Sequence, residues 1–459
     1  MRNGGISFWH RQIGLAPPRE PLDGSRSADV AIAGGGYTGL WTAYYLKRAQ
    51  PELEIVVLER EFCGFGASGR NGGWVSSAFA GSREQLARTH GRDRVLALQR
   101  QMQATVDEVL AVAKAEGIDA DLIKPGMLRV ARGPAQLARL ERQVAEDRRW
   151  DLGETDLRLV DRDETERRLR VAGVSGAELS PHCARSHPAK LVTGLARAVA
   201  DLGVKLYEDT TVESIEPGVV RTDRGDVRAP TILTCLEGFT PSLPSQRRSL
   251  LPLNSAMIVT DPLPDRLWDE IGWSGCECLG DGAHAYMYAQ RTQDDRIALG
   301  GRGVPYRFGS RTDNWGATQR STVGQLTAVL HSMFPQALGI GIDQAWCGVL
   351  GVRRDWIPTI TYDPRSGLGG AGGYVGNGVA VTNLAGRTLR DLVLGRVTEL
   401  TALPLVNHHG RDWEPEPLRF IGARLVYGLY RAADRHEGSS GRAGDSQLAR
   451  AADLLSGRH

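Results

Sequence analysis

The sequence is poor in several features that would point to particular classes of protein. Six cysteines in 459 residues are too few and too unevenly spaced for a disulfide framework. Cys276 and Cys278 are one residue apart, but no second pair of ligands follows at zinc spacing, so we expect no metal site. No apolar run reaches the length of a membrane-spanning helix or of a signal peptide. We therefore expect a soluble, cytoplasmic protein with reduced thiols and no membrane insertion.

An excess of charge of one sign is also missing. The chain carries 56 basic and 54 acidic residues, which are interspersed and give a net charge of +2. This balance offers no basic field for nucleic acid or for an anionic membrane. The length predicts two domains, because single cores rarely grow beyond about 250–300 residues. The composition as a whole favours a globular enzyme that acts on a small molecule.

Glycine is abundant, and its placement near the N-terminus is informative. A short apolar strand from Asp29 runs into six residues that open a helical pattern: Gly34, Gly35, Gly36, Tyr37, Thr38 and Gly39. The first glycine makes the turn, the third admits a pyrophosphate, and the last lets the helix lie close to the strand. A second apolar strand ends in Glu59, where a carboxylate can accept hydrogen bonds from ribose hydroxyls. The pattern predicts a dinucleotide site and leaves NAD and FAD open.

Two later glycine-rich segments favour a flavin. Residues 64–74 read Gly-Phe-Gly-Ala-Ser-Gly-Arg-Asn-Gly-Gly-Trp, and residues 373–379 read Gly-Tyr-Val-Gly-Asn-Gly-Val. With the first turn and the segment Trp413-Glu-Pro-Glu-Pro-Leu-Arg419, they resemble the FAD-dependent D-amino-acid oxidase superfamily over nearly the whole chain. Within it, the sequence looks most like the γ-glutamylputrescine oxidoreductase branch. The resemblance implies FAD as the cofactor.

The resemblance and the order of apolar strands and helical patterns imply an α/β plus α+β protein. We expect a Rossmann-like FAD-binding domain of the glutathione-reductase type and a separate substrate domain with an antiparallel sheet. Residues 1–81, 188–245 and 341–459 are expected to form the FAD-binding domain, the last with the C-terminal helix. Residues 82–187 are expected to be a mainly helical insertion of the substrate domain, and residues 246–340 to be its sheet.

The resemblance also implies which residues contact FAD. The first turn would face the pyrophosphate, Glu59 the adenosine ribose, and Val212 the adenine through its backbone. The segment from Ser68 to Gly73 would run beside the isoalloxazine ring. The helix that follows Gly376 would direct its positive end at the flavin N1 and O2 edge, where reduced flavin is anionic. The full set is Gly34, Gly35, Gly36, Tyr37, Thr38, Gly39, Glu59, Arg60, Ser68, Gly69, Arg70, Asn71, Gly72, Gly73, Val212, Gly376, Asn377, Gly378 and Val379.

Departures from the family bear on flavin attachment and on the electron acceptor. Relatives with histidyl flavin have a histidine in the segment where this chain has Asn71, which implies noncovalent FAD. Cys347 lies near the region of cysteinyl attachment in monomeric sarcosine oxidases, so that linkage stays open. The lysine that activates oxygen in those oxidases has no counterpart at 296–301. The acceptor is therefore oxygen or another carrier such as a quinone.

The implied reaction is oxidation of the carbon–nitrogen bond of an amine or amino acid by hydride transfer to flavin N5. The imine then hydrolyses to a carbonyl compound. This chemistry needs orientation and desolvation more than a nucleophile, and the sequence assigns no catalytic residue. Tyr288 could wall the substrate pocket, and Arg302 could bind a substrate carboxylate. A 2-hydroxy acid or polyol dehydrogenase and a non-catalytic FAD-binding subunit of a complex are the alternatives.

Overall fold

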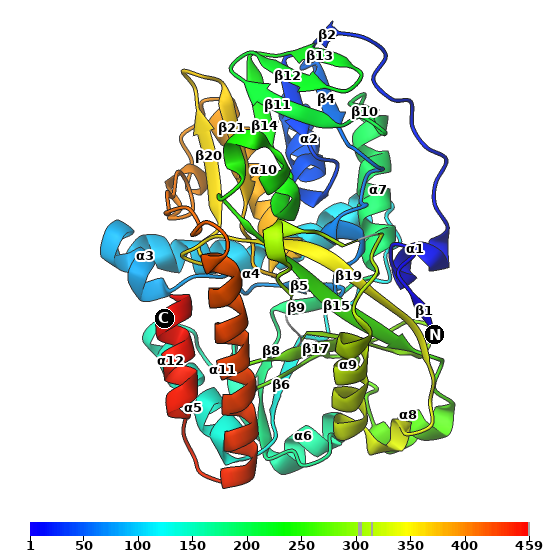
Figure 1. The fold of residues 1–459 in the computed structure, drawn as a ribbon, viewed down its shortest axis with the longest axis vertical. Helices are drawn as coiled ribbons and strands as arrows, with labels where there is room; N and C mark the ends of the chain where they lie inside the picture. The colour runs from blue at the N-terminus through cyan, green and yellow to red at the C-terminus, as the bar shows by residue number, and fades with distance from the viewer. Residues whose placement is uncertain (302–304, 314, 458–459) are drawn as a thin grey trace.

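Two sheets organise the protein (Figure 1), and the computed structural model describes residues 1–301, 305–313 and 315–457. The six-stranded sheet lies in the upper half of Figure 1 and the nine-stranded sheet in the lower half. In sheet order, the smaller contains β10 (Lys205–Tyr207), β4 (Ile55–Leu58), β3 (Val30–Ala33), β14 (Thr231–Thr234), β21 (Leu368–Gly372) and β20 (Thr359–Asp363). In the same way, the larger contains β1 (Arg2–Asn3), β19 (Ile342–Val352), β15 (Leu251–Thr260), β18 (Ile297–Gly301), β17 (Met287–Arg291), β16 (Cys278–Asp281), β6 (Met127–Ala131), β8 (Gly176–Ser180) and β7 (Arg158–Asp161).

The six-stranded sheet is parallel except for β20 and is covered on both faces. Val30 and Ile32 of β3 pack with helices on one face, while Ala31 packs on the other face against a small sheet. Strands buried on both faces are typical of parallel sheets and explain the continuous apolar runs in the sequence. The covering elements are α2 (Tyr37–Ala49), α7 (Pro188–Asp201) and α10 (Gly378–Val393) on one side, and β11 (Val212–Glu216), β12 (Val219–Thr222), β13 (Gly225–Arg228) and β2 (Arg26–Ser27) on the other.

The nine-stranded sheet also packs on both faces. Ala256 and Ile258 of β15 belong to the core formed with two helices, α8 (Asp265–Ile271) and α9 (Arg320–Met333). Met257 and Val259 of the same strand pack on the other face against α1 (Phe8–Ile13). This alternation follows from the two-residue period of a strand.

The sheet is mixed, whereas we expected an antiparallel sheet. Most neighbours are antiparallel, but β1 with β19 and β6 with β16 are parallel pairs. The parallel pairs arise because β6 from the 82–187 region and β1 from the N-terminus join strands that are distant in sequence. The expected domain boundary at residue 340 also precedes β19, which pairs along its length with β15. We therefore propose that the boundary lies after Val352; the other boundaries stay predictions.

The 82–187 region supplies helices that contact both sheets. The sequence predicted mainly helical structure here, and a turn at Gly91 with a φ of +84° separates α3 from α4. Leu98, Met102 and Val106 form the buried stripe of α4, in the same core as α10. The helices of this region are α3 (Arg83–His90), α4 (Arg92–Ala115), α5 (Pro134–Arg149) and α6 (Arg162–Arg168).

The C-terminal region forms a helical hairpin, where the sequence predicted one helix. Its members are α11 (Leu418–Ser440) and α12 (Gln447–Ser456), seen at the lower left of Figure 1. A short ladder of β5 (Trp74–Ser76) and β9 (Cys183–Arg185) lies between the two large sheets. Among the described residues, no helix has the length and apolar character needed to cross a bilayer.

Candidate functional site

The glycine turn predicted to bind a pyrophosphate connects β3 to α2. Gly34 has a φ of +109°, and a Cβ at this position would lie 2.5 Å from the carbonyl oxygen of Cys235. A Cβ on Gly39 would lie 2.1 Å from the carbonyl oxygen of Gly34. Both distances are far below van der Waals contact, so only glycine fits either position. The strand, the helix and the end of β14 thus approach more closely than side chains would allow.

The start of α2 presents backbone N–H groups. Gly36 is the N-cap and supplies no side-chain hydrogen bond, while the N–H of Tyr37 donates to the hydroxyl of Ser68 at 2.8 Å. The side chains of Tyr37 and Thr38 face protein partners, a backbone carbonyl and the hydroxyl of Tyr374 respectively. The backbone at Gly36 and the hydroxyl of Ser68 therefore offer the polar groups that an anion at a helix start requires.

Glu59 follows β4 and lies against this turn. Its carboxylate accepts hydrogen bonds from the N–H of Gly35 at 2.8 Å and of Glu61 at 3.1 Å. Burial raises the pKa of Glu59, and the two N–H groups oppose that shift. The side chain is still partly exposed, so its oxygens keep acceptor capacity for hydroxyl groups. Arg60 is exposed, with its guanidinium 5.4 Å from the ring centre of Phe239.

Val212, the expected backbone contact of adenine, begins β11 near Glu59. The N–H of Thr210 donates to the carbonyl of Glu59 at 2.9 Å, which places the chain before Val212 beside the end of β4. Val212 itself pairs with Thr222 and is half-buried against the outer face of the six-stranded sheet. Its contact with adenine stays a prediction.

The segment from Ser68 to Gly73 is closed by the side chain of Asn71. The amide nitrogen donates to the carbonyl of Ser68 at 2.7 Å and to that of Ala67 at 3.2 Å. The amide oxygen accepts from the N–H of Gly73 at 2.8 Å. Asn71, which stands where some relatives carry histidine, therefore shapes the segment through local hydrogen bonds.

Arg70 anchors the same segment in the interior. Its guanidinium donates to the carbonyl of Phe65 at 2.6 Å and to that of Cys347 at 3.2 Å, and it pairs with Asp313 at 2.7 Å. Both charged side chains are almost fully buried, so each needs the other. The sequence did not predict this ion pair, because nothing local to Arg70 indicates Asp313.

The glycines of this segment lie against side chains from other elements. A Cβ on Gly69 would lie 2.2 Å from Cε1 of His10 in α1, and one on Gly72 would lie 2.6 Å from the ring of Tyr288 in β17. Gly73 is equally crowded by a second side chain of β17. The small residues thus admit α1 on one side and the nine-stranded sheet on the other.

The third predicted segment connects β21 to α10. Gly376 has a φ of +97°, and α10 begins at Gly378 after an Asn377 N-cap whose side chain makes no capping hydrogen bond. The hydroxyl of Tyr374 lies 3.0 Å from that of Thr38 in α2. This contact ties the starts of α2 and α10 together.

Glu237, which the sequence analysis did not identify, joins the same region. Its carboxylate accepts from the N–H groups of Gly351 at 3.0 Å, Gly373 at 2.8 Å and Tyr374 at 3.3 Å. Burial raises the pKa of Glu237 to about 7, against the effect of these three donors. One feature of the sequence could have identified Glu237: it comes shortly after an apolar strand, as Glu59 does.

These groups share one edge of the six-stranded sheet. The Gly34 turn follows β3, Glu59 follows β4, Glu237 follows β14, and Gly376 follows β21, and these four parallel strands are neighbours. The carboxyl ends of adjacent parallel strands are where open α/β sheets bind ligands. The structure therefore brings together glycine turns, helix starts and a partly exposed carboxylate, which fit the pyrophosphate and ribose of FAD.

On the side of the nine-stranded sheet, Tyr288 reaches the segment from Ser68 to Gly73. Its ring lies over Gly72 and over Gly300, where a Cβ would be 2.4 Å from the ring, and its hydroxyl lies 3.1 Å from that of Ser255. Trp74 packs edge-on at 6.3 Å between ring centres. Burial raises the pKa of Tyr288 to about 12, so the hydroxyl stays neutral. Arg302, the other expected substrate contact, lies outside the described residues.

Cys347 is buried in β19. Its Sγ lies 3.3 Å from the carbonyl oxygen of Ala317, and burial raises its pKa to about 12. A thiol of this pKa is protonated near neutrality, whereas the thiolate is the reactive form. This environment favours an inert thiol.

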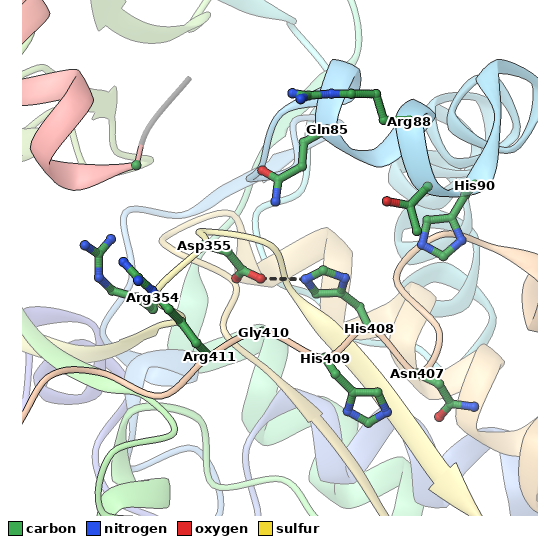
Figure 2. A pocket seen from close by; sticks show the side chains of 12 residues that line it. Gln85, Arg88, His90, Arg354, Asp355, Asn407, His408, His409, Gly410 and Arg411 are labelled. Atoms are coloured by element: carbon green, nitrogen blue, oxygen red, sulfur yellow. Dashed lines mark hydrogen bonds and ion pairs between the residues drawn. The ribbon is translucent and has the colours of Figure 1, made fainter.

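A separate cavity of about 750 Å³ lies between the end of α3, the chain after β19 and residues 407–411 (Figure 2). Of the described residues that line it, none is an expected FAD contact. The cavity is therefore distinct from the sheet edge that carries the glycine turns.

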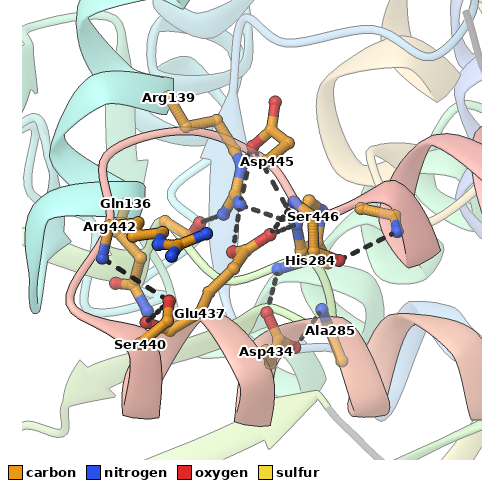
Figure 3. A network of polar contacts seen from close by, with 12 residues as sticks. Gln136, Arg139, His284, Ala285, Asp434, Glu437, Ser440, Arg442, Asp445 and Ser446 are labelled. Carbon is orange, nitrogen blue, oxygen red and sulfur yellow. Dashed lines mark hydrogen bonds and ion pairs between the residues drawn. The ribbon is translucent and has the colours of Figure 1, made fainter.

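A cluster of potential metal ligands lies elsewhere, between α11 and the loop before β17. His284, Glu437 and Asp445 bring ligand-type atoms within 4.8 Å of one another. Figure 3 shows the guanidinium of Arg139 among them, 2.7 Å from Glu437 and 2.9 Å from Asp445. Arg139 supplies the positive charge that these carboxylates require, so we assign no metal to the cluster. The network fastens the C-terminal hairpin to α5 and to that loop.

Comparison with known proteins identifies the family. Residues 29–392 match the model of the DAO family, described as FAD dependent oxidoreductase. The gamma-glutamylputrescine oxidoreductase of Escherichia coli K12 is 30% identical over 414 residues, which are 88% of this chain and 92% of that protein. A probable oxidoreductase OrdL of Rhizobium meliloti is 30% identical over 409 residues, 87% of this chain and 90% of that protein.

Solved structures agree on the fold. The glycine oxidase of Geobacillus kaustophilus superposes with a TM-score of 0.66 at 21% identity, over 84% of this chain and 100% of that chain. The L-proline dehydrogenase of P. horikoshii has the same TM-score at 18% identity, over 84% of this chain and 96% of that one. With the family match and the geometry of the sheet edge, the chain belongs to the DAO family of FAD-dependent oxidoreductases.

Proposed function

We propose that this enzyme oxidises the carbon–nitrogen bond of a small amine or amino acid. The observation that carries the proposal is the position of Tyr288, whose ring lies on Gly72 in the segment expected beside the isoalloxazine ring. Two relatives support this substrate class by name, the gamma-glutamylputrescine oxidoreductase of E. coli and a glycine oxidase of Geobacillus kaustophilus that is 26% identical over 409 residues.

FAD, when bound, would supply a two-electron acceptor for hydride from the carbon next to nitrogen. The substrate nitrogen loses a proton, and the imine adds water and releases an amine or ammonia with a carbonyl compound. Oxygen or another acceptor such as a quinone would have to take up the two electrons. The chain has to bind both reactants, exclude water and orient the carbon–hydrogen bond.

Residues at the sheet edge divide these tasks. Glu59 would hold the adenosine end of the cofactor, and the backbone N–H of Gly36 would hold its pyrophosphate. The start of α10 at Gly378 provides positive potential for the charge of reduced flavin. Tyr288 walls the substrate side as a neutral hydrogen-bonding group, because its raised pKa prevents it from acting as a base near neutrality.

We further propose that the sheet with the glycine turns is an FAD-binding domain of the glutathione-reductase type and that FAD is bound without a covalent link. The buried, protonated state of Cys347 supports the second point. Acid precipitation tests it: we expect the flavin in the supernatant. Flavin in the pellet would contradict noncovalent binding, and its release in Cys347→Ser would then identify the linkage.

Anaerobic mixing of the FAD-loaded enzyme with a panel of amines, amino acids and 2-hydroxy acids tests the reaction. We expect amines or amino acids to bleach the visible flavin absorbance. Bleaching by hydroxy acids alone would favour a 2-hydroxy acid dehydrogenase, and bleaching by none would favour a non-catalytic FAD-binding subunit. Admission of air after bleaching then distinguishes the acceptor, since rapid recovery of absorbance indicates oxygen and slow recovery indicates another carrier.

A further inference from the structure

The cavity of about 750 Å³ beside α3 is lined by residues to which the proposed reaction assigns no role. Figure 2 shows His90 pointing from α3 toward His408 and Arg88 lying along α3 at the rim, while Arg354, His408 and Arg411 belong to the opposite wall. These two walls come from segments more than 250 residues apart in the sequence. Their meeting is therefore a product of the fold and not of a local run of charge.

The carboxylates near the cavity are already bound. Asp355 is the only acidic residue among the described lining residues, and it accepts from Nε2 of His408 at 2.6 Å and from a backbone N–H. Glu414, just outside the lining, takes Nε of Arg354 with both carboxylate oxygens, at 3.1 and 3.2 Å. The shortest contacts of these two acids are thus with His408 and Arg354.

Two arginines keep donors that the protein does not use. Arg88 donates from Nε to the carbonyl of Glu84 at 3.3 Å, and its terminal nitrogens have no partner among the described residues. Among the described residues, Arg411 has one ion pair, with Glu414 at 3.7 Å, which is beyond hydrogen-bond distance. The pKa of His90 is lowered by burial and by the positive charges of Arg94 and His408, which agrees with a positive potential on this wall.

We propose that this cavity binds a phosphorylated small molecule. Planar guanidinium groups match phosphate oxygens in pairs, and free donors on both walls suit a ligand with several negative charges. The volume falls within the range of about 300–1,000 Å³ that holds small molecules, which is more space than a single phosphate needs. The uncharged polar side chain of Gln85, which points from α3 into the cavity in Figure 2, can contact the remainder of the ligand.

Calorimetric titration of the FAD-loaded enzyme at low ionic strength tests the proposal. FAD occupies its own pyrophosphate site, and the visible flavin absorbance reports that it stays bound. The probes are ADP, pyrophosphate, inorganic phosphate and adenosine. We expect one saturable site for ADP and none for adenosine. If pyrophosphate binds as tightly as ADP, the site recognises the phosphate groups alone. If ADP binds more tightly than pyrophosphate, the nucleoside contributes to binding as well.

The double substitution Arg88→Gln and Arg411→Gln should weaken ADP binding at least tenfold. Arg365→Gln with Arg396→Gln is the matched control, because both positions are exposed arginines outside the cavity lining, and it should leave binding unchanged. Absence of saturable binding for every phosphorylated probe would overturn the proposal. So would an equal loss of binding in the control variant.

Discussion

The starts of α2 and α10 resemble each other and yet differ in what fixes them. Each helix follows a glycine turn at the carboxyl end of a parallel strand, and the Thr38–Tyr374 contact joins them. At α2 there is no space for a side chain on Gly39, whereas a Cβ on Gly378 in α10 would make ordinary contacts at 3.6 Å. Close backbone approach therefore defines the first start, and the charge of an uncapped helix end defines the second.

Of the substitutions that test this comparison, Gly39→Ala should have the largest effect. The added Cβ collides with backbone, so the turn must move; we expect unfolding free energy to fall by about 1–3 kcal/mol and FAD binding to weaken at least about 100-fold. Flavin fluorescence titration and thermal unfolding measure both effects. Gly378→Ala is the matched control and should keep FAD bound. Equal losses in the two variants would remove the difference between the helix starts.

The next effect concerns Glu237 beside α10. Its folded-state pKa is raised from 4.5 to about 7, so its stabilising contribution is present below the lower value and is lost as pH rises through the higher one. The shift corresponds to about 3 kcal/mol. The unfolding free energy of the wild type, relative to Glu237→Gln, should therefore fall by this order between pH of about 4.5 and 8. Parallel stability profiles for the two proteins would contradict the assignment.

Glu59→Gln sharpens the comparison at the α2 side. Loss of a charged acceptor for hydroxyl groups should weaken FAD binding about tenfold, because such hydrogen bonds contribute about 1.5 kcal/mol. The visible spectrum of bound flavin should be unchanged, since Glu59 is assigned to the adenosine end. Glu61→Gln serves as the control, because the Glu61 carboxylate pairs, among the described residues, with the neighbouring Arg60 alone, at 3.3 Å. A changed flavin spectrum in Glu59→Gln would place this residue near the ring instead.

The smallest effect is expected at the contact between the helices. Thr38→Val and Tyr374→Phe each remove one hydroxyl of the pair, and a double-mutant cycle should give a coupling energy of about 1 kcal/mol. Chemical denaturation of the FAD-loaded proteins supplies the four free energies. Strict additivity would show that the two helix starts are positioned independently.

The sequence predicted the strands and helices on either side of the glycine turns, because nearby residues determine these elements. The turn at Gly34 needs a positive φ, and Glu59 ends a strand whose apolar run is visible in the sequence. The partners of Arg70 were not predictable, since Asp313 is 243 positions away and enters from another part of the fold. The contact of Tyr288 with Gly72 likewise depends on how the two sheets meet. The predicted FAD contacts themselves await measurement.

The secondary structure likewise divides into features that nearby residues determine and features that depend on distant contacts. The prediction of a mainly helical insertion at residues 82–187 did not indicate that Gly91 would separate two helices, because one glycine inside a helical pattern is often tolerated. β19 contains Asp343 and Gln344 before its apolar part, and pairing with β15 rather than local pattern makes it a strand. Register between distant strands is a property of the whole sheet, so a single sequence carries little information about it.

The pairing of β19 with both β1 and β15 sets an order of events during synthesis. Arg2 pairs with Gln344, and Leu251 pairs with Val352. The ribosome therefore has to release the chain beyond residue 352 before this sheet can be completed, while β1 and α1 emerge at the outset. Until then β15 can pair with β18 along one edge only, so its other edge stays open to wrong partners while the rest of the chain is made.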